Sequence, residues 1–413
     1  MANKDDKDDI EYLNKHEMSR RDFMLDFLAA GGMMAAGLTM PNMLRAAEKS
    51  ADDEVVRIGY LPITDATSLL VAHAMGYFED EGLKTVRPTL IRGWSPLVES
   101  FAAGKVNLVH LLNPIPVWMR YNNNFPVKIM SWAHINGSGV IVGQHTGATS
   151  FKDLGGMQVA VPFWYSSHNI ILQMALRHVG LKPVIKSTSE QIAKDEVNLQ
   201  VMPPPSMPPA LASQKIDAYI VAEPFNAAGE LLAHGKMLRF TGDIWKNHPC
   251  CVVCMNEKVV AAKPTWTQKV MNAIVRAEVY AQNNKEEVAV MLSKDGKRYL
   301  PMPAKVVVRA MTDYKPSDYS KPDAIEHPNW GNGRIDFSPY PYPSATKLIV
   351  ESMNKTLVSG NTTFLNKLDP DFVTKDLVNY DFVKKAMAKY KGWENAPGVN
   401  MKHPFEREEV ISL

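Results

Sequence analysis

Cysteine is scarce in this chain. The 413 residues include three cysteines, and these fall within five positions as Cys250, Cys251 and Cys254. Two strand residues four positions apart are separated by roughly 13 Å, which is far beyond the reach of a disulfide. The sequence therefore excludes a disulfide framework as the source of stability. The clustering of all the thiols at one place calls for another reason.

The sequence also lacks a strong charge of one sign and long apolar runs. The formal net charge is +2, so neither a nucleic acid nor an acidic membrane surface is indicated as a partner. No stretch of 18 apolar residues follows residue 47, so we expect the mature chain to be soluble. A P-loop, a zinc-protease HExxH motif and a serine-hydrolase elbow are missing as well. We therefore predict no catalytic residues, no cofactor and no metal ligands.

The most informative motif present lies near the N-terminus. Residues 19–24 read Ser-Arg-Arg-Asp-Phe-Met, which matches the twin-arginine export signature, and a Gly- and Met-rich apolar stretch follows at 25–40. That stretch is too short and too weakly hydrophobic for a stable membrane span, and the leader has no cysteine for a lipid anchor. We predict that residues 1–47 are a signal peptide, that the twin-arginine translocase exports the chain, and that it works in the periplasm. A cytoplasmic chain with a chance arginine pair is the alternative.

Apolar segments and helical patterns alternate after a polar linker at 48–54. Strands are predicted at 55–60, 84–91, 106–112, 157–161, 216–222 and 251–255, and helices at 68–75, 96–103, 167–179 and 265–292. This spacing is typical of βαβ units with mostly parallel sheets. We therefore predict an α/β fold of two lobes that face a cleft. The first lobe would span 55–150 and the second 151–250, while 251–413 would return to the first lobe and continue as a helical extension.

Several segments resemble the nitrate- and bicarbonate-binding proteins of ABC importers, whose superfamily also binds taurine, alkanesulfonates and thiamine-type pyrimidines. The matching segments are 59–66 (GYLPITDA), 76–78 (GYF), 110–116 (HLLNPIP), 201–207 (VMPPPSM), 216–219 (IDAY), 222–227 (AEPFNA) and 241–249 (TGDIWKNHP). The resemblance implies a type II periplasmic binding protein, each lobe a mixed, mostly parallel sheet with flanking helices. It implies an extracytoplasmic solute-binding component that works with a membrane permease and an ATPase.

Three residues match the pocket of that family. Trp94 corresponds to the family's pocket tryptophan and is expected on the loop that follows the second strand, although a core aromatic is the alternative. Asn136 stands where nitrate binders carry a glutamine, so the amide is kept with a shorter reach. His168 matches the pocket histidine and lies at the start of a helix, where the dipole favours an anion.

Four further polar residues are candidates for the cleft. Thr64 and Asp65 end the first strand, and Asp65 suits an anion site only if it pairs with a cation or caps a helix. Asn113 ends the third strand within a matching segment. Glu223 follows a strand, where a lobe hinge or a helix cap is an equally good interpretation.

Cys251 marks the departure that bears on ligand identity. Nitrate binders follow the His-Pro of this region with Glu-Lys, and the lysine pairs with the anion, whereas here Cys251 occupies the lysine position. The loss removes a charge-assisted hydrogen bond of roughly 1.5–3 kcal/mol. The bicarbonate branch has a metal-assisting carboxylate there, which this chain also lacks. We therefore expect poor nitrate binding and a neutral or softer solute, or a soft metal.

The cysteines can also be interpreted as small buried hydrophobes. On a strand, Cys251 and Val253 would share one face, and Cys250 and Cys254 the other, so the three thiols should not form one metal site. The spacing also resembles the Cys-rich motif of eukaryotic thiamine-pyrimidine synthases. That family needs a lysine and a histidine where this chain has Leu111 and Ile115, so no Schiff base to pyridoxal phosphate can form. We predict that the chain is not an enzyme, and a periplasmic ligand sensor remains as a third possibility.

Overall fold

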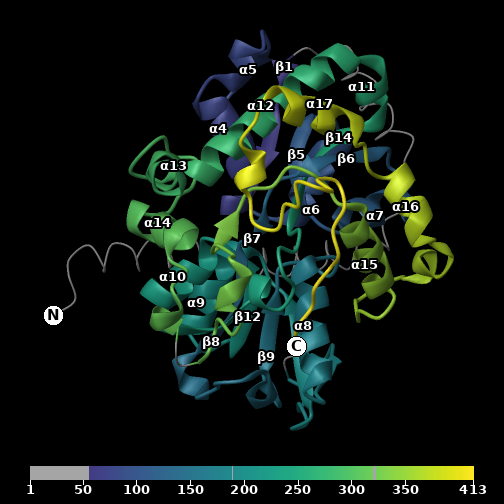
Figure 1. The fold of residues 1–413 in the computed structure, drawn as a ribbon. Coiled ribbons are helices and arrows are strands. Elements are labelled where there is room, and N and C mark those ends of the chain that lie inside the picture. Colours follow the sequence, from purple (N-terminus) through teal and green to yellow (C-terminus); the bar gives the residue numbers. More distant parts are fainter. Residues whose placement is uncertain (1–54, 188, 320–321) are drawn as a thin grey trace.

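The computed structural model describes residues 55–187, 189–319 and 322–413, so the predicted leader lies outside the described part. Two sheets organise it. The first has the order β4-β2-β5-β14-β6 and the second the order β10-β11-β9-β12-β8-β13. Figure 1 shows them as two bodies, the first in the upper half of the view and the second in the lower half.

The first sheet consists of β2 (Ile58–Tyr60), β4 (Thr89–Leu90), β5 (Leu108–Leu112), β6 (Val127–Trp132) and β14 (Cys251–Asn256). Strands β4, β2 and β5 run parallel, while β14 lies antiparallel between β5 and β6. Every residue of β14 is buried. The chain thus returns from the second sheet to the centre of the first, which brings the cysteine cluster into its core.

The second sheet consists of β8 (Ser138–Gly143), β9 (Gln158–Val161), β10 (Lys182–Val184), β11 (Glu196–Val201), β12 (Ala218–Ala222) and β13 (Gly235–Phe240). Strands β10, β11, β9 and β12 are parallel, and β8 runs antiparallel to both β12 and β13. The sequence interpretation assigned 138–143 to the first lobe, whereas the pairing of β8 places these residues in the second sheet.

Helices flank both sheets. Those associated with the first sheet and its extensions are α4 (Thr67–Ala74), α5 (Tyr77–Asp80), α6 (Trp94–Ala102), α7 (Ile115–Tyr121), α11 (Glu257–Ala262), α12 (Pro264–Asn283), α13 (Lys285–Leu292), α15 (Pro343–Met353), α16 (Pro370–Asp376) and α17 (Asp381–Lys389). Those near the second sheet are α8 (Ser167–His178), α9 (Met207–Ala212), α10 (Phe225–Leu232) and α14 (Ala304–Thr312). Helix α12 packs against α4 and α17 above the first sheet (Figure 1).

Two crossover segments connect the sheets and lie side by side. Residues 133–137, which include β7 (Ile135–Asn136), lead out of the first sheet, and residues 241–250, which include η5 (Thr241–Asp243), lead back. Ile135 forms a β-bridge with Pro249, and the Asn136 amide donates to the His248 carbonyl at 3.0 Å. These two paired segments therefore form the connection between the two sheets.

Three predicted elements differ in the structure. The strand expected at 84–91 is divided into β3 (Lys84–Thr85), which pairs with β1 (Val55–Val56), and β4. Pro88 separates the two pieces, because proline has no amide hydrogen for a sheet ladder. The helix expected at 265–292 is interrupted at Asn284, which ends α12 and precedes α13. Trp94, expected on a loop, is instead the first residue of α6.

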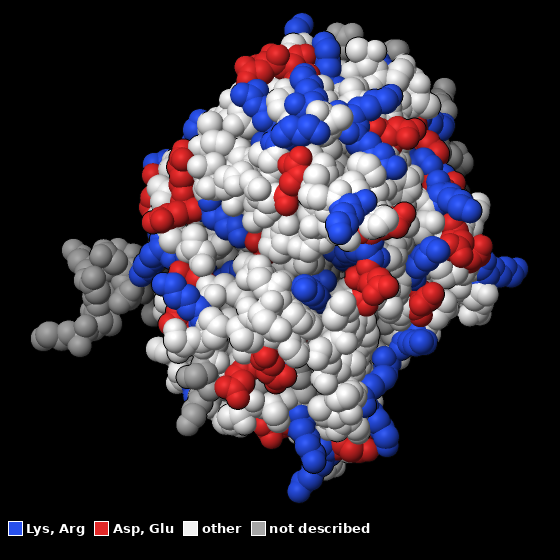
Figure 2. Space-filling model, in the orientation of Figure 1, with Lys and Arg blue, Asp and Glu red and all other residues white. Residues whose placement is uncertain are grey.

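The surface shown in Figure 2 carries both signs of charge interspersed, in keeping with the small net charge. Within the described ranges, we find no helix with the length and apolar character needed to cross a membrane.

Candidate solute site between the two sheets

Three helices begin with buried polar atoms that have no protein partner. Helix α4 follows β2 and begins with Thr67 and Ser68, α6 follows β4 and begins with Trp94, and α8 follows β9 and begins with Ser167 and His168. The unpartnered atoms are Thr67 Oγ1, Ser68 Oγ, Trp94 Nε1, Ser167 Oγ and His168 Nδ1. A buried polar atom without a partner costs about 1–3 kcal/mol. Such atoms at helix starts are suited to a polar solute.

The starts of α4 and α8 converge on Cys250, although they belong to different sheets. The Cys250 thiol lies 3.4 Å from Asp65 Oδ2, just before α4, and 3.8 Å from His168 Nε2. The Ser167 amide donates to the Asn113 carbonyl at 2.7 Å, and the Asn113 amide donates to the Cys250 carbonyl at 2.8 Å. Backbone bonds therefore join α8 to the strand ends of the first sheet.

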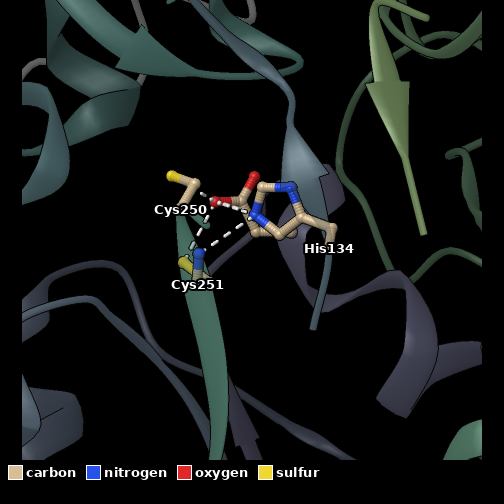
Figure 3. Close-up of side chains that lie close together, drawn as sticks. His134, Cys250 and Cys251 are labelled. Atoms are coloured by element: carbon tan, nitrogen blue, oxygen red, sulfur yellow. Dashed lines mark hydrogen bonds and ion pairs between the residues drawn. The ribbon is translucent and has the colours of Figure 1, made fainter. Parts of the chain in front are cut away.

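Asp65, His134, Cys250 and Cys251 form a fully buried cluster. Asp65 Oδ2 lies 2.9 Å from His134 Nε2 and accepts from the Cys251 thiol at 3.0 Å. One ligand-type atom from each of the four residues lies within 4.8 Å of the other three, so the set could hold a metal ion. Figure 3 shows the three labelled side chains close together, with His134 on the chain between β6 and β7 and with Cys250 and Cys251 at the start of β14.

Charge and burial act in opposite directions on this cluster. Burial alone would lower the pKa of His134, but Asp65 raises it to about 10. Burial raises the pKa of Asp65 and is partly offset by His134. Burial also favours the neutral thiol at both cysteines, and it raises the pKa of Cys251. At Cys250 a hydrogen bond from Cys251, together with His134 and His168, outweighs burial and holds the pKa of this thiol well below its usual range. Asp65 therefore pairs with a cation, as the sequence required for a role in an anion site.

Trp94 packs against His110 on β5. The two rings are 5.6 Å apart and meet edge to face, and 3% of Trp94 is exposed. Burial lowers the pKa of His110 to about 3, and its Nε2 accepts the Leu61 amide hydrogen at 3.0 Å, which requires a neutral ring. The indole is therefore held in a fixed orientation while Nε1 stays unpartnered.

His168 is fixed from the second sheet. Its Nε2 lies 2.9 Å from Ser138 Oγ at the start of β8, and its Nδ1 has no protein partner. Ser166 caps the helix, since its hydroxyl oxygen accepts the Asn169 amide hydrogen at 3.1 Å. The predicted position at a helix start is what the structure shows.

Thr64 and Glu223 use their polar groups within the protein. The Thr64 amide and hydroxyl both donate to the Glu223 carbonyl, at 2.8 and 3.1 Å. The Glu223 carboxylate accepts from Arg334 Nε at 2.6 Å and from the Ala227 amide at 3.0 Å. The geometry favours the interpretation of Glu223 as a helix cap and lobe connector.

Asn136 lies on β7 with a backbone φ of 59°. Its side-chain amide donates to Asp336 at 3.1 Å, while Oδ1 is buried without a protein partner. A Cβ added at Gly242 would lie 2.5 Å from that oxygen, so the glycine is needed for the approach. Asn136 therefore belongs to the crossover, and Asn113 contributes the backbone bonds described above.

The expected strand alternation is wrong for Cys250 and Cys251. Both thiols contact Asp65 because Cys250 precedes β14 and follows Pro249, so it is outside the regular pleat. Cys254 lies within β14, away from this cluster, where burial raises its pKa.

Sequence reasoning did not select His134, Cys250, His110 or Ser138 as site residues. His134 comes two residues after β6 ends, which is the kind of strand-end position that could have identified it. Nothing in the sequence places it opposite residues 250–251.

The comparisons with known proteins agree with this architecture. The family model described as the NMT1-like family matches residues 49–293. The nitrate/nitrite binding protein NrtA of Nostoc is 24% identical over 326 residues, which cover 73% of this chain and 71% of that protein. The nitrate import ATP-binding protein NrtC of Synechocystis is 23% identical over 57% of this chain and 36% of its own length.

Solved structures show the same fold. The periplasmic nitrate-binding protein NrtA from Synechocystis superposes with a TM-score of 0.70 at 17% identity, covering 86% of this chain and 92% of that one. The desulfurization enzyme DSZB also superposes, with a TM-score of 0.52 at 15% identity over 82% of this chain and 100% of that one. The predicted two-lobed fold and the predicted resemblance are confirmed, and this chain belongs to the NMT1-like family.

Proposed function

We propose that this chain is the extracytoplasmic solute-binding component of an ABC-type importer and captures a small solute between its two sheets. The observation that carries this proposal is the set of unpartnered buried atoms on α4, α6 and α8, which come from both sheets and include Trp94 and His168. A cleft between two α/β bodies is a common place for a small ligand. The relatives that bind nitrate support the class of protein.

The solute is one that accepts hydrogen bonds without needing a fixed cation. The free donors are an indole N–H and hydroxyls, and Cys251 replaces the lysine of nitrate binders. Arg334 is held by Glu223 and Glu230, and His134 by Asp65. Small neutral organic solutes fit this balance better than anions such as nitrate, bicarbonate or sulfonates do.

The proposed partners are a membrane permease with its ATPase, and the proposed location is the periplasm. The match to the ATP-binding protein NrtC supports the first, and the solved periplasmic relative supports the second. The leader residues Arg20 and Arg21 support export by the twin-arginine translocase. Replacing both by lysine should leave the precursor in the cytoplasm, and periplasmic arrival of that variant by the same route would reject this part of the proposal.

We propose binding without catalysis because the sequence lacks the lysine and the histidine of the enzyme family that its cysteine motif resembles. Leu111 and Ile115 stand where thiamine-pyrimidine synthases need lysine and histidine. The DSZB similarity shows that the fold itself is compatible with an enzyme. Recovery of an unchanged solute after prolonged incubation with the protein would support binding, and stoichiometric excess of a product would reject it.

The main test is calorimetric titration of the mature protein with nitrate, bicarbonate, alkanesulfonates and pyrimidines. One class should bind with 1:1 stoichiometry and stabilise the protein by about 2.7 kcal/mol at 100 times its dissociation constant. A sensor would bind equally well, so uptake of that solute should then be measured in cells with and without the chain. Unchanged uptake without the chain would favour the sensor over the importer.

A further inference from the structure

The buried cluster of Asp65, His134, Cys250 and Cys251 has the composition of a soft-metal site. Two thiols, one imidazole and one carboxylate are a ligand set that Zn²⁺ accepts, while magnesium and calcium prefer oxygen ligands alone. The four side chains are all fully buried, and their ligand-type atoms lie within 4.8 Å of one another. We propose that these four residues bind one Zn²⁺-type ion in tetrahedral geometry.

The present distances are close to what such an ion requires. Around tetrahedral zinc, bond lengths of about 2.0–2.3 Å place neighbouring ligand atoms about 3.3–3.8 Å apart. Asp65 Oδ2 lies 2.9 Å from His134 Nε2, 3.0 Å from Cys251 Sγ and 3.4 Å from Cys250 Sγ. Shifts of less than about 1 Å would open the set around an ion. Zinc binds thiolates and a neutral imidazole, so protons still held by the thiols and by His134 would be released on binding.

The surrounding residues hold these ligands in place. Ser138 Oγ lies 3.6 Å from Cys250 Sγ, within reach of a hydroxyl donor to a sulfur ligand. A Cβ at Gly137 would approach His134 Nδ1 to 3.0 Å, so the glycine allows the ring its position. His134 and Cys250 belong to the two crossover segments (Figure 3), and Asp65 precedes α4 in the sequence. An ion here would fasten both crossovers to the first sheet.

This site goes beyond the proposed capture of a solute, because its four ligand residues are not those that carry the unpartnered polar atoms of α4, α6 and α8. Its test therefore needs no importer and no knowledge of the solute. The mature protein is prepared metal-free and reduced with a phosphine, and then titrated with Zn²⁺ alone. We expect one equivalent bound with a dissociation constant below about 1 μM. Absence of binding would overturn the proposal and leave the importer proposal standing.

Cysteine variants identify the ligands. The double variant Cys250→Ser with Cys251→Ser should weaken Zn²⁺ binding by about 100-fold or more, because each thiolate is a direct ligand. Cys254→Ser is the matched control, since Cys254 is an equally buried thiol on the same strand as Cys251 but outside the cluster. It should stay within about 3-fold of the native chain. Equal affinity of the double variant and the control would reject this ligand set.

A spectroscopic measurement on the native protein avoids reliance on variants that could fail to fold. Co²⁺ replaces Zn²⁺ in such sites, and thiolate ligands give it an intense near-ultraviolet charge-transfer band together with visible bands of tetrahedral cobalt. Both should appear at one equivalent and disappear when Zn²⁺ is added. Octahedral, thiolate-free cobalt spectra would contradict the proposal.

Discussion

Trp94 has a buried ring and an indole N–H that no protein atom accepts. Trp94→Phe keeps most of the packing against His110 and removes that donor. We expect it to weaken solute binding about 5- to 10-fold, corresponding to one hydrogen bond of about 1 kcal/mol. Calorimetry on the folded variant measures this. Trp393→Phe is the control, because that indole donates to the Met387 carbonyl elsewhere, and equal losses in both variants would contradict the assignment.

Single residues show where sequence reasoning stops. Trp94 and His168 could be selected, because family motifs and a helix start carry information about position. The pairing of Cys250 and Cys251 with Asp65 could not, since it depends on the exact residue at which β14 begins. His134 was missed because its partner Asp65 lies 69 residues earlier in the chain. The strand order, which the sequence pattern does not give, brings the two residues together.

At the scale of elements, the N-terminus of α8 is set by its cap. Ser166→Ala removes the acceptor for the Asn169 amide and should cost about 1 kcal/mol of unfolding free energy, measured by urea denaturation. Because His168 is in the first turn, the same change should also weaken solute binding. Asn256→Ala removes the corresponding cap of α11 and should cost similar stability with unchanged solute affinity. Unchanged solute affinity in Ser166→Ala would show that the start of α8 is not part of the solute site.

A second element contact joins α7 to α16. Arg120 Nε donates to Asp376 at 2.6 Å, and this holds the pKa of the Asp376 carboxyl below its usual range. A lowered carboxyl pKa contributes stability that is fully present above the unfolded value near 3.9 and is lost as the pH falls through the lowered folded value. Asp376→Asn should therefore cost about 1 kcal/mol at pH 7, after screening by solvent, and less at pH 3.

The control for this pair is Asp371→Asn on the same helix. Asp371 pairs with Lys347, but both side chains are largely exposed, so the effect should be near zero at either pH. Urea midpoints at pH 7 and pH 3 provide the comparison. A cost for Asp376→Asn that stays constant across this range would show that the ionised carboxylate is not the source of the stability.

Elements were easier to predict than their pairing. The parallel strands β2, β5, β9 and β12 were found because each is an apolar run near a helical pattern. The antiparallel strands β6, β8 and β13 were not identified, since no helix separates β6 from β8 and the crossover between them is short. The break at Asn284 escaped because the apolar period continues through it.

For the whole molecule, the buried site implies that the lobes must separate before a solute can enter. Cys250 and Cys251 are 0% exposed, and the Ser167 and Thr64 amides bridge the two sheets. We expect the solute-free protein to open at the crossovers and to close on binding. Small-angle scattering should give a smaller radius of gyration at saturation, and an unchanged radius would count against closure.

Thiol labelling tests the same motion with a control inside the chain. In metal-free, solute-free protein, opening of the lobes should let a small alkylating reagent reach Cys250 and Cys251, which lie where the second crossover segment joins β14. Cys254 is buried within β14 between β5 and β6, so lobe motion leaves it covered. Mass spectrometry should therefore find label at 250 and 251 before 254, and bound solute should suppress it there. Simultaneous labelling of all three cysteines would indicate unfolding of the first sheet instead of movement of the lobes.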